Sequence, residues 1–353
     1  MAKDKERLSL DDVIKKVNKD AGADIVGYGI PKREYVRIPF TSPRMNYCTY
    51  GGIPTGRLIE FYGEEHGGKT TTALDIVGNY QRMQDELPEE ERKKVAYLDS
   101  ENTLDVEWAA KLGVDVDNLI LLQPEEESAE DLLQIMLDLL STGKIGLGVI
   151  DSIAAMVSAQ ALDKTVADKT YAGISMPLTT FGNKAIMLCK KYNATIIGIN
   201  QIRDDLSAMY GGAIKTPGGR GWKHLCSVRM QFMRGSFIDE KGNEIKRSSE
   251  SPAGNKVLMT MVKNKTCPSN RRGGYYTIDY ANGIDYLTDL LEVALKYNLI
   301  LQKGAWFSVI DPDTGEILAD KLQGMNNVRE FFMDESHEDV LTFVENYIDS
   351  KIC

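Results

Sequence analysis

The segment from Gly63 to Thr70, Gly-Glu-Glu-His-Gly-Gly-Lys-Thr, fits the pattern G-x-x-x-x-G-K-[ST] of a loop that binds nucleotide phosphates. It follows the apolar run 58–62 and opens a stretch with helical periodicity, which is the context that the motif requires. Glycines let backbone N–H groups approach phosphates, and the helix N-terminus adds a positive dipole end. Lys69 is expected to reach the β- and γ-phosphates, and Thr70 to bind Mg²⁺ through its hydroxyl. The predicted nucleotide-binding residues of this loop are Gly63, Glu64, Glu65, His66, Gly67, Gly68, Lys69, Thr70 and Thr71.

Acidic residues end two apolar strands that are expected near this loop. Asp151 ends the run 147–150, and Asp99 and Glu101 follow the run 94–98. Enzymes with this loop place an aspartate such as Asp151 near Mg²⁺, usually through water. A carboxylate at position 99 or 101 would face the γ-phosphate and orient or deprotonate a water molecule. A single acid at a strand end more often caps a helix or lies in a solvated loop. Here the acids share a sheet edge with the loop, which favours a function for Asp151 and for one of the other two.

An alternation of apolar strands and helices between residues 57 and 200 must position these side chains. Strands are predicted at 57–62, 94–98, 119–122, 146–150 and 194–199, and helices at 69–84, 105–112, 128–141 and 174–192. This alternation predicts an α/β fold with a mainly parallel central sheet and helices on both faces. Ligands of such sheets bind at the carboxyl ends of the strands.

The pattern changes outside this region. Residues 202–224 are rich in glycine and lack periodicity, and a meander of strands is predicted at 226–234, 256–263 and 274–279. The last unit, 285–353, is predicted to contain a helix at 286–297, a hairpin-like stretch at 304–318 and one or two terminal helices. At the other end, residues 8–20 are predicted to form a short amphipathic helix.

The charge of the chain is divided into blocks. The 353 residues include 42 Lys and Arg and 52 Asp and Glu, which gives a net charge of −10. Residues 1–150 have 18 basic and 28 acidic side chains, residues 151–280 have 19 and 10, and residues 281–353 have 5 and 14. The middle block therefore has a net charge of +9 although the whole chain is acidic. Two explanations are open for such blocks: a chance uneven distribution of charge, or a single basic binding surface.

Composition excludes several classes of protein. A chain that is 42% hydrophobic and 27% charged is typical of a soluble globular protein, not of a collagen-like, disordered or membrane protein. The first residues lack the apolar segment of a secretory signal. Five scattered cysteines with no C-x-x-C spacing indicate reduced thiols and argue against a zinc site. A cytoplasmic location without a membrane partner is therefore expected.

From about Tyr50 to Lys303 the chain resembles a RecA-type homologous recombinase of bacteria or bacteriophages. The segments that carry the resemblance are Gly52-Ile-Pro-Thr-Gly-Arg-Leu-Ile-Glu-Phe-Tyr-Gly63, the phosphate loop, Ala96-Tyr-Leu-Asp-Ser-Glu101, Lys111-Leu-Gly-Val-Asp-Val-Asp-Asn118, Gln123-Pro124, Val149-Ile-Asp-Ser-Ile-Ala-Ala155, Ile199-Asn-Gln-Ile-Arg203, Gly218-Gly219, Val262-Lys-Asn-Lys265 and Gly304-Ala-Trp-Phe307. Their order and spacing agree with the family.

The resemblance implies roles for individual residues. It selects Glu101 over Asp99 as the group that activates water, and it places Asp105 and Trp108 at the adenine of ATP. It implies that Gln201 senses the γ-phosphate. Lys263 and Lys265, two apart and thus on one face of a strand, would reach the γ-phosphate bound by the neighbouring subunit. A solvated strand edge is the alternative for the two lysines, and core packing is the alternative for Trp108.

The resemblance also implies two DNA-binding segments, about 163–173 and 202–220. A loop of about 20 residues inside a compact domain is either functional or disordered. Basic groups would contact phosphates, glycines would allow close approach, and the aromatic and apolar side chains would stack on or wedge between bases. The predicted DNA-binding residues are Lys169, Tyr171, Arg203, Leu206, Met209, Tyr210, Lys215, Gly218, Gly219 and Arg220.

The expected organisation has three parts: an N-terminal oligomerisation arm (1–35), a RecA-like ATPase core (36–283) and a small α/β C-terminal domain (284–353). The expected function is an ATP-dependent, Mg²⁺-requiring recombinase that forms filaments with itself on single-stranded DNA and exchanges strands with homologous double-stranded DNA. Single-strand-binding and mediator proteins are possible partners. Two alternatives are a ring-forming RecA-fold helicase and a DNA-coating mediator that barely hydrolyses ATP.

Overall fold

The computed structural model describes residues 9–22, 25–29, 35–165, 173–204, 214–240, 242–246 and 251–352. It contains two compact units, Met1–Tyr35 and Val36–Cys353. Each unit is described by itself.

The first unit contains the predicted N-terminal helix, α1 (Leu10–Ala21). The Oγ of Ser9 caps its first turn by accepting from the Asp12 N–H at 3.2 Å. The described residues 25–29 belong to no strand. Their backbone is bonded instead by Asn18, whose Oδ1 accepts from the N–H groups of Ile25 and Val26, each at 2.9 Å.

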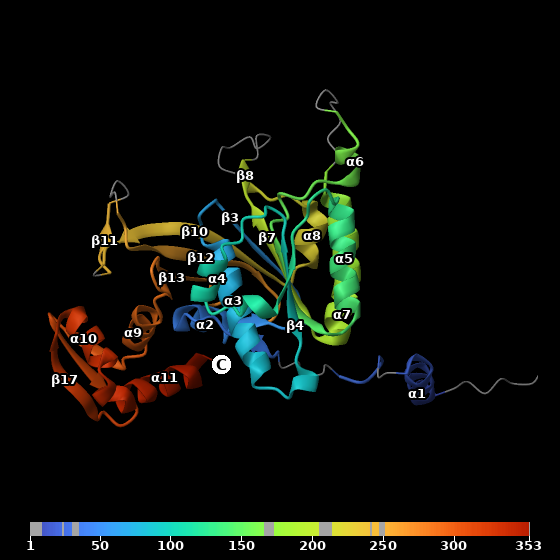
Figure 1. Ribbon diagram of the computed structural model, residues 1–353. Coiled ribbons are helices and arrows are strands. Elements are labelled where there is room, and N and C mark those ends of the chain that lie inside the picture. The colour runs from blue at the N-terminus through green and yellow to red at the C-terminus, as the bar shows by residue number, and fades with distance from the viewer. Residues whose placement is uncertain are drawn as a thin grey trace, which may run out of the picture. The chain divides into compact units, whose positions relative to one another are not determined.

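The second unit is built on a ten-stranded sheet (Figure 1). Its strands, from one edge to the other, are β14 (Gly283–Ile284), β13 (Gly273–Asp279), β12 (Gly254–Asn264), β10 (Val228–Ile238), β3 (Leu58–Gly63), β7 (Thr195–Gln201), β6 (Ile145–Asp151), β4 (Lys94–Asp99) and β5 (Leu119–Leu122), with β11 (Glu244–Ile245) beside β10. The strands from β10 to β5 are parallel, and those from β10 to β14 are antiparallel. The α/β class with a mainly parallel sheet is therefore confirmed.

Helices cover both faces of the parallel strands (Figure 1), and the central strands β3, β6 and β7 are accordingly buried on both sides. One face packs α3 (Lys69–Asp85) and α4 (Val106–Lys111). The other face packs α5 (Ala129–Ser141), α7 (Ser175–Tyr192) and α8 (Gly219–Leu225). The smaller elements of this region are β1 (Arg37–Ile38), α2 (Pro43–Thr49), β2 (Ile53–Pro54), η1 (Glu89–Glu91), η2 (Val116–Asn118) and α6 (Ala159–Leu162).

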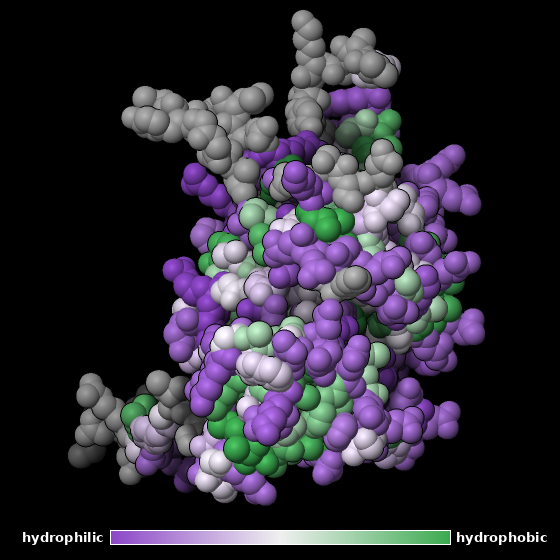
Figure 2. Space-filling model, turned by 90° about the vertical axis from the view of Figure 1, so that its left-hand side faces the viewer, coloured by the Kyte–Doolittle hydropathy of each residue, from purple (hydrophilic) through white to green (hydrophobic). Residues whose placement is uncertain are grey.

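The C-terminal residues have their own hydrophobic cluster, formed between helices and one face of a three-stranded sheet. The elements are α9 (Tyr286–Lys296), β15 (Ile300–Lys303), β16 (Trp306–Ile310), β17 (Ile317–Gln323), α10 (Gly324–Met333), η3 (Glu335–His337) and α11 (Glu338–Ile352). The expected hairpin at 304–318 is thus part of a larger sheet. Figure 2 looks onto this side of the molecule, where apolar side chains gather in the lower part of a mostly hydrophilic surface.

The Gly-rich segment 202–224 has more structure than expected. β8 (Arg203–Asp204) pairs with β9 (Ile214–Lys215), and α8 begins at Gly219. Trp222, which is fully buried, anchors this helix against Phe181 with ring centroids 6.5 Å apart. The second predicted DNA-binding segment therefore ends inside a helix. No helix of the described residues is long and apolar enough to cross a membrane.

Candidate functional site

The phosphate loop joins β3 to α3 at the carboxyl edge of the sheet, where the sequence predicts it. Gly68, the residue before α3, has φ +88°, and a Cβ at this position would lie 2.7 Å from Cγ2 of Val257. Both the backbone conformation and the close packing therefore require glycine. The loop leaves the first backbone N–H groups of α3 available for a phosphate.

Lys69 is buried within the loop and is only 8% exposed. Its Nζ donates to the Glu64 carbonyl at 2.5 Å. Burial lowers the pKa of Lys69, although the carboxylates of Asp151, Glu65, Glu101 and Glu64 oppose that shift. An anionic phosphate at this site would favour the charged ammonium, so the site fits a polyphosphate.

Thr70 and Asp151 form the predicted metal-binding pair. The Oγ1 of Thr70 donates to Oδ2 of Asp151 at 2.8 Å. Burial raises the pKa of Asp151, while its bonds from the hydroxyls of Thr70 and Tyr97 lower it. No group of three or more His, Cys, Asp or Glu able to hold a metal exists among the described residues. Mg²⁺ needs no such group, because it binds through one or two protein oxygens together with substrate phosphates and water. The pair therefore fits Mg²⁺ bound with a nucleotide.

Glu101 and Gln201 meet at the same edge of the sheet. Oε1 of Glu101 accepts from Oγ of Ser152 at 2.6 Å and from Nε2 of Gln201 at 3.4 Å. The alternative acid, Asp99, is 2% exposed and accepts from the N–H groups of Thr103 and Leu104. Asp99 therefore stabilises the turn after β4, whereas Glu101 is exposed and available to a ligand.

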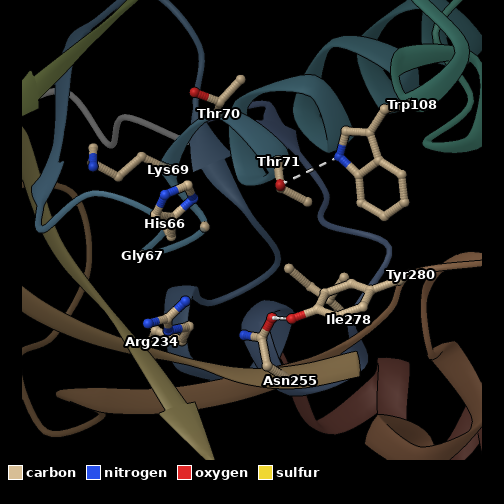
Figure 3. A pocket seen from close by; sticks show the side chains of 11 residues that line it. His66, Gly67, Lys69, Thr70, Thr71, Trp108, Arg234, Asn255, Ile278 and Tyr280 are labelled. Carbon is tan, nitrogen blue, oxygen red and sulfur yellow. Dashed lines mark hydrogen bonds between the residues drawn. The ribbon is translucent and has the colours of Figure 1, made fainter. Parts of the chain in front are cut away.

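A pocket of about 490 Å³ adjoins the phosphate loop (Figure 3). Among the predicted nucleotide-binding residues, His66, Gly67, Gly68, Lys69, Thr70, Thr71 and Trp108 line it. Trp108 is partly buried, and its Nε1 donates to Oγ1 of Thr71 at 3.4 Å. Figure 3 shows the indole at the end of the pocket away from Lys69. This separation places an aromatic surface for a base apart from the phosphate loop.

Other predicted residues lie around the pocket rather than on its wall. These are Gly63, Glu64, Glu65, Asp105 and Asp151. Asp105 caps α4, and its Oδ1 accepts from the Trp108 N–H at 2.9 Å. This cap holds the first turn of the helix that carries Trp108.

Four further lining residues were not predicted from the sequence: Arg234, Asn255 and Ile278 on the antiparallel strands, and Tyr280, which directly follows β13. The Tyr280 hydroxyl donates to Oδ1 of Asn255 at 2.8 Å, and the tyrosine faces Trp108 across the pocket (Figure 3). They belong to three separate chain segments and to no motif. The only signal was that their strands continue the sheet next to the phosphate loop.

Lys263 and Lys265 lie on one side of the chain, as expected, although β12 ends at Asn264. Both contact the C-terminal end of α8. Nζ of Lys263 donates to the carbonyls of Lys223 at 2.7 Å and His224 at 3.0 Å, and Nζ of Lys265 donates to His224 at 3.5 Å. Cations are favoured there by the helix dipole. In the single protomer, the two ammonium groups thus bind α8.

The predicted DNA-binding residues are only partly described. Lys169, Tyr171, Leu206, Met209 and Tyr210 lie outside the described residues. Arg203 is on β8 and Lys215 on β9, while Gly218, Gly219 and Arg220 begin α8. Gly218 has φ +89°, which a non-glycine residue rarely adopts.

A buried polar network links this segment to the strands of the nucleotide site. Nδ2 of Asn200 donates to Oε1 of Glu60 at 3.0 Å and to the Pro217 carbonyl at 2.9 Å. Glu60 is fully buried and forms an ion pair with Arg229. Since Asn200 precedes Gln201, adjacent side chains at the end of β7 bond the segment before α8 on one side and Glu101 on the other.

Comparison with known proteins extends the resemblance. Residues 9–285 match a family model described as the RecA N-terminal domain. Protein RecA of Ruminococcus albus is 35% identical over 298 residues, which cover 84% of this chain and 68% of the relative. Protein RecA of Lactobacillus johnsonii is 33% identical over 352 residues, covering 99% and 90%. Protein RecA of Lactobacillus delbrueckii subsp. bulgaricus is 32% identical over 352 residues, covering 99% and 98%. The similarity therefore includes both the nucleotide site and the C-terminal residues.

Proposed function

Since the chain belongs to the RecA family, it is an ATP-dependent DNA recombinase, and we propose how its described residues divide that activity. Its enzymatic reaction is DNA-dependent hydrolysis of ATP coupled to strand exchange. Neither a ring-forming helicase nor a non-catalytic mediator is favoured, because the match to RecA proteins extends over 99% of the chain.

In the proposed division, the phosphate loop and α3 bind the phosphates, with Lys69 as the cation. Thr70 and Asp151 hold Mg²⁺, which when bound neutralises charge that develops on the phosphates. The base lies in the pocket between Trp108 and Tyr280. Asp105 acts indirectly, by capping the helix of Trp108.

Glu101 is the proposed general base. Its exposed carboxylate lies beside Ser152 and Gln201, which orient it by hydrogen bonds to Oε1. Oε2 is then the oxygen for a water molecule that attacks the γ-phosphate, and that oxygen takes the proton. The carboxylate of Asp99 already accepts hydrogen bonds from the backbone of a turn, whereas that of Glu101 does not within the described residues. This difference is the observation that supports the assignment most strongly.

Lys263 and Lys265 are proposed to act on the nucleotide of a neighbouring protomer in a filament. In that role they resemble arginine fingers supplied in trans, which stabilise the charge of the transition state. Their bonds to the α8 carbonyls in the single protomer would have to exchange for bonds to phosphate. Hydrolysis would then depend on assembly.

The proposed DNA-binding surface includes β8, β9 and the first turn of α8. Single-stranded DNA is the substrate that nucleates the filament, and homologous double-stranded DNA is the second substrate. Sequence-neutral binding needs backbone contacts and stacking rather than readout of base edges. Single-strand-binding and mediator proteins remain proposed partners, and the bacterial cytoplasm is the proposed location.

Electron microscopy with single-stranded DNA and a non-hydrolysable ATP analogue tests the assembly. We expect helical filaments for the wild type and for Lys144→Ala, an exposed control outside the site. We expect none for Lys69→Ala, because the loop loses its phosphate-binding cation. Closed rings from the wild type, or nucleotide-dependent filaments of Lys69→Ala, would contradict the proposal.

A further inference from the structure

Tyr97 has a buried hydroxyl that no part of the function described above uses. The side chain is 1% exposed and belongs to the hydrophobic cluster between the sheet and α3. Its hydroxyl donates to Oδ2 of Asp151 at 2.8 Å. A phenol in the core needs a polar partner for its hydroxyl, and here the partner is the carboxylate of the proposed Mg²⁺ site.

The register of the sheet explains how the two residues meet. β4 and β6 are parallel neighbours, with Tyr97 beside Val149 and Asp99 beside Asp151. Alternation therefore puts Tyr97, Val149 and Asp151 on one face, the face covered by α3. Two residues along a parallel strand span about 6.6 Å, which is close to the length of a tyrosine side chain. The hydroxyl of Tyr97 thus reaches Asp151 at the end of β6.

Asp151 thus receives hydroxyl groups from two sides. Thr70 donates to Oδ2 from the start of α3, and Tyr97 donates to the same atom from within the sheet. The two donors are not equivalent, because Thr70 is exposed whereas Tyr97 is buried. Water competes with the bond from Thr70, and the oxygen of Thr70 is itself a proposed metal ligand. The bond from Tyr97 has neither limitation.

We propose that Tyr97 is a positioning residue for Mg²⁺, because it fixes the orientation of the Asp151 carboxylate through Oδ2. The proposal rests on the assignment of Thr70 and Asp151 to the metal site in the proposed function. Neither hydroxyl uses Oδ1 of Asp151, so that oxygen is left for the metal or its bound water. Hydrogen-bond partners that orient a metal ligand typically contribute 10- to 100-fold to metal affinity.

The test is Tyr97→Phe, which removes one oxygen and keeps the ring. Mn²⁺ serves as the probe of the metal site in the full chain saturated with a non-hydrolysable ATP analogue. Free Mn²⁺ is measured by electron paramagnetic resonance, so the readout does not depend on turnover. We expect the Mn²⁺ dissociation constant to rise about 10-fold, while thermal unfolding without metal remains a single cooperative transition.

Tyr80→Phe is the matched control. Tyr80 is also a buried tyrosine of the same cluster, 5% exposed, but it lies on α3. Tyr80→Phe shows how the loss of a buried hydroxyl away from Asp151 affects Mn²⁺ binding. We expect its Mn²⁺ dissociation constant to stay within about twofold of the wild-type value.

A double-mutant cycle with Asp151→Asn separates the effect of Tyr97 on Asp151 from the role of Asp151 in binding the metal. If Tyr97 acts through Asp151, Tyr97→Phe should change the Mn²⁺ dissociation constant by less than about twofold in the Asp151→Asn background. An unchanged dissociation constant for Tyr97→Phe alone, or an equal effect in both backgrounds, would overturn the proposal. Unchanged Mn²⁺ binding in Asp151→Asn itself would instead overturn the metal assignment of the proposed function.

Discussion

Two acids, Asp99 and Glu101, follow β4 within one turn and have different surroundings. Asp99 is buried and binds backbone N–H groups of the turn, so its removal would disturb the fold. Glu101 is exposed, and within the described part of the chain its carboxylate accepts from the side chains of Ser152 and Gln201. At the residue scale, Glu101, the proposed general base, can therefore be substituted without disturbing the turn that Asp99 stabilises.

Glu101→Gln tests that separation. The amide keeps the size of the side chain but cannot accept a proton, so hydrolysis should fall about 10²- to 10⁴-fold. Binding of an ATP analogue should remain near the wild-type level, as measured by calorimetry. Glu107→Gln, on the exposed surface of α4, is the control and should keep full activity. Loss of nucleotide binding in Glu101→Gln would refute its role as a base.

A second acid with an unusual environment lies far from the nucleotide. Asp289, on α9, is fully buried, and its carboxylate lies near the Ser42 hydroxyl and the Thr277 backbone. Burial raises its pKa to about 8, and the nearby charge of Arg44 and the Ser42 hydroxyl oppose that shift only in part, while Asp285 adds to it. The folded protein therefore holds a proton here at neutral pH.

The raised pKa of Asp289 makes the stability of the folded protein depend on pH. Between the ordinary pKa of 3.8 and about 8, the folded chain binds one proton more than the unfolded chain, so stability falls as pH rises. Asp289→Asn removes this dependence, so it should be more stable than the wild type at pH 8 by about 5 kcal/mol, since each unit of pKa shift corresponds to about 1.4 kcal/mol. Near pH 4 the two proteins should be equally stable. Urea unfolding from about pH 4.5 to 8.5 measures this difference, and parallel curves for the two proteins would contradict the prediction.

At the scale of elements, α8 connects the two proposed interfaces of the core. Its first turn carries Gly219 and Arg220 of the DNA-binding surface, and its last carbonyls bind Lys263 and Lys265. Asn200, on the strand that ends in Gln201, bonds the carbonyl of Pro217, two residues before this helix. A structural change at either proposed interface would therefore act on the same seven-residue helix.

Mixing variants tests whether the lysines act in trans. Lys263→Ala/Lys265→Ala and Glu101→Gln should each be inactive in DNA-stimulated hydrolysis when alone. In a mixed filament, some interfaces join a double-alanine protomer to a Glu101→Gln protomer. At such an interface the first protomer supplies an intact Glu101, and the second supplies intact lysines. Random mixing in equal amounts should restore up to about a quarter of wild-type hydrolysis. No recovery in filaments that contain both variants would show that the lysines do not act across the interface.

Most elements could be predicted from the sequence, and the exceptions have physical reasons. The strands and helices between residues 57 and 200 have long apolar runs and strong periodicity, and their positions agree with the structure to within one or two residues. α8 was missed because a seven-residue helix that contains two glycines has no local signal. It is stabilised by burial of Trp222 against α7, which is a tertiary contact.

The same distinction applies to the nucleotide site. The phosphate loop and Asp151 follow from a contiguous motif and a strand end. Arg234, Asn255, Ile278 and Tyr280 could not be predicted, because they meet the pocket only when three antiparallel strands extend the sheet. The bond from Tyr97 to Asp151 likewise requires the register of β4 and β6.

At the scale of the whole molecule, the net charge of −10 conceals a basic block. Residues 151–280, with 19 basic and 10 acidic side chains, contain the described parts of both proposed DNA-binding segments and the two lysines. Residues 281–353, with 5 and 14, form the acidic C-terminal part. A binding surface for a polyanion is therefore expected on the core.

Salt dependence of binding measures this surface. The affinity for single-stranded DNA should fall linearly with the logarithm of salt concentration, because each phosphate contact releases counterions. Arg220→Ala should reduce the magnitude of that slope by about 0.7, the value for one contact on single-stranded DNA. Lys144→Ala, outside the basic block, should leave the slope unchanged. A salt-independent affinity would refute the basic surface.

The central claim is that this chain couples ATP hydrolysis at one site to assembly on single-stranded DNA. Phosphate release with and without single-stranded DNA tests it most directly, at saturating ATP and Mg²⁺. We expect slow phosphate release without DNA, and a rate that rises with added DNA until the protein is fully bound. Glu101→Gln should show no rise under the same conditions. A wild-type rate that does not change when DNA is added and bound would contradict the account.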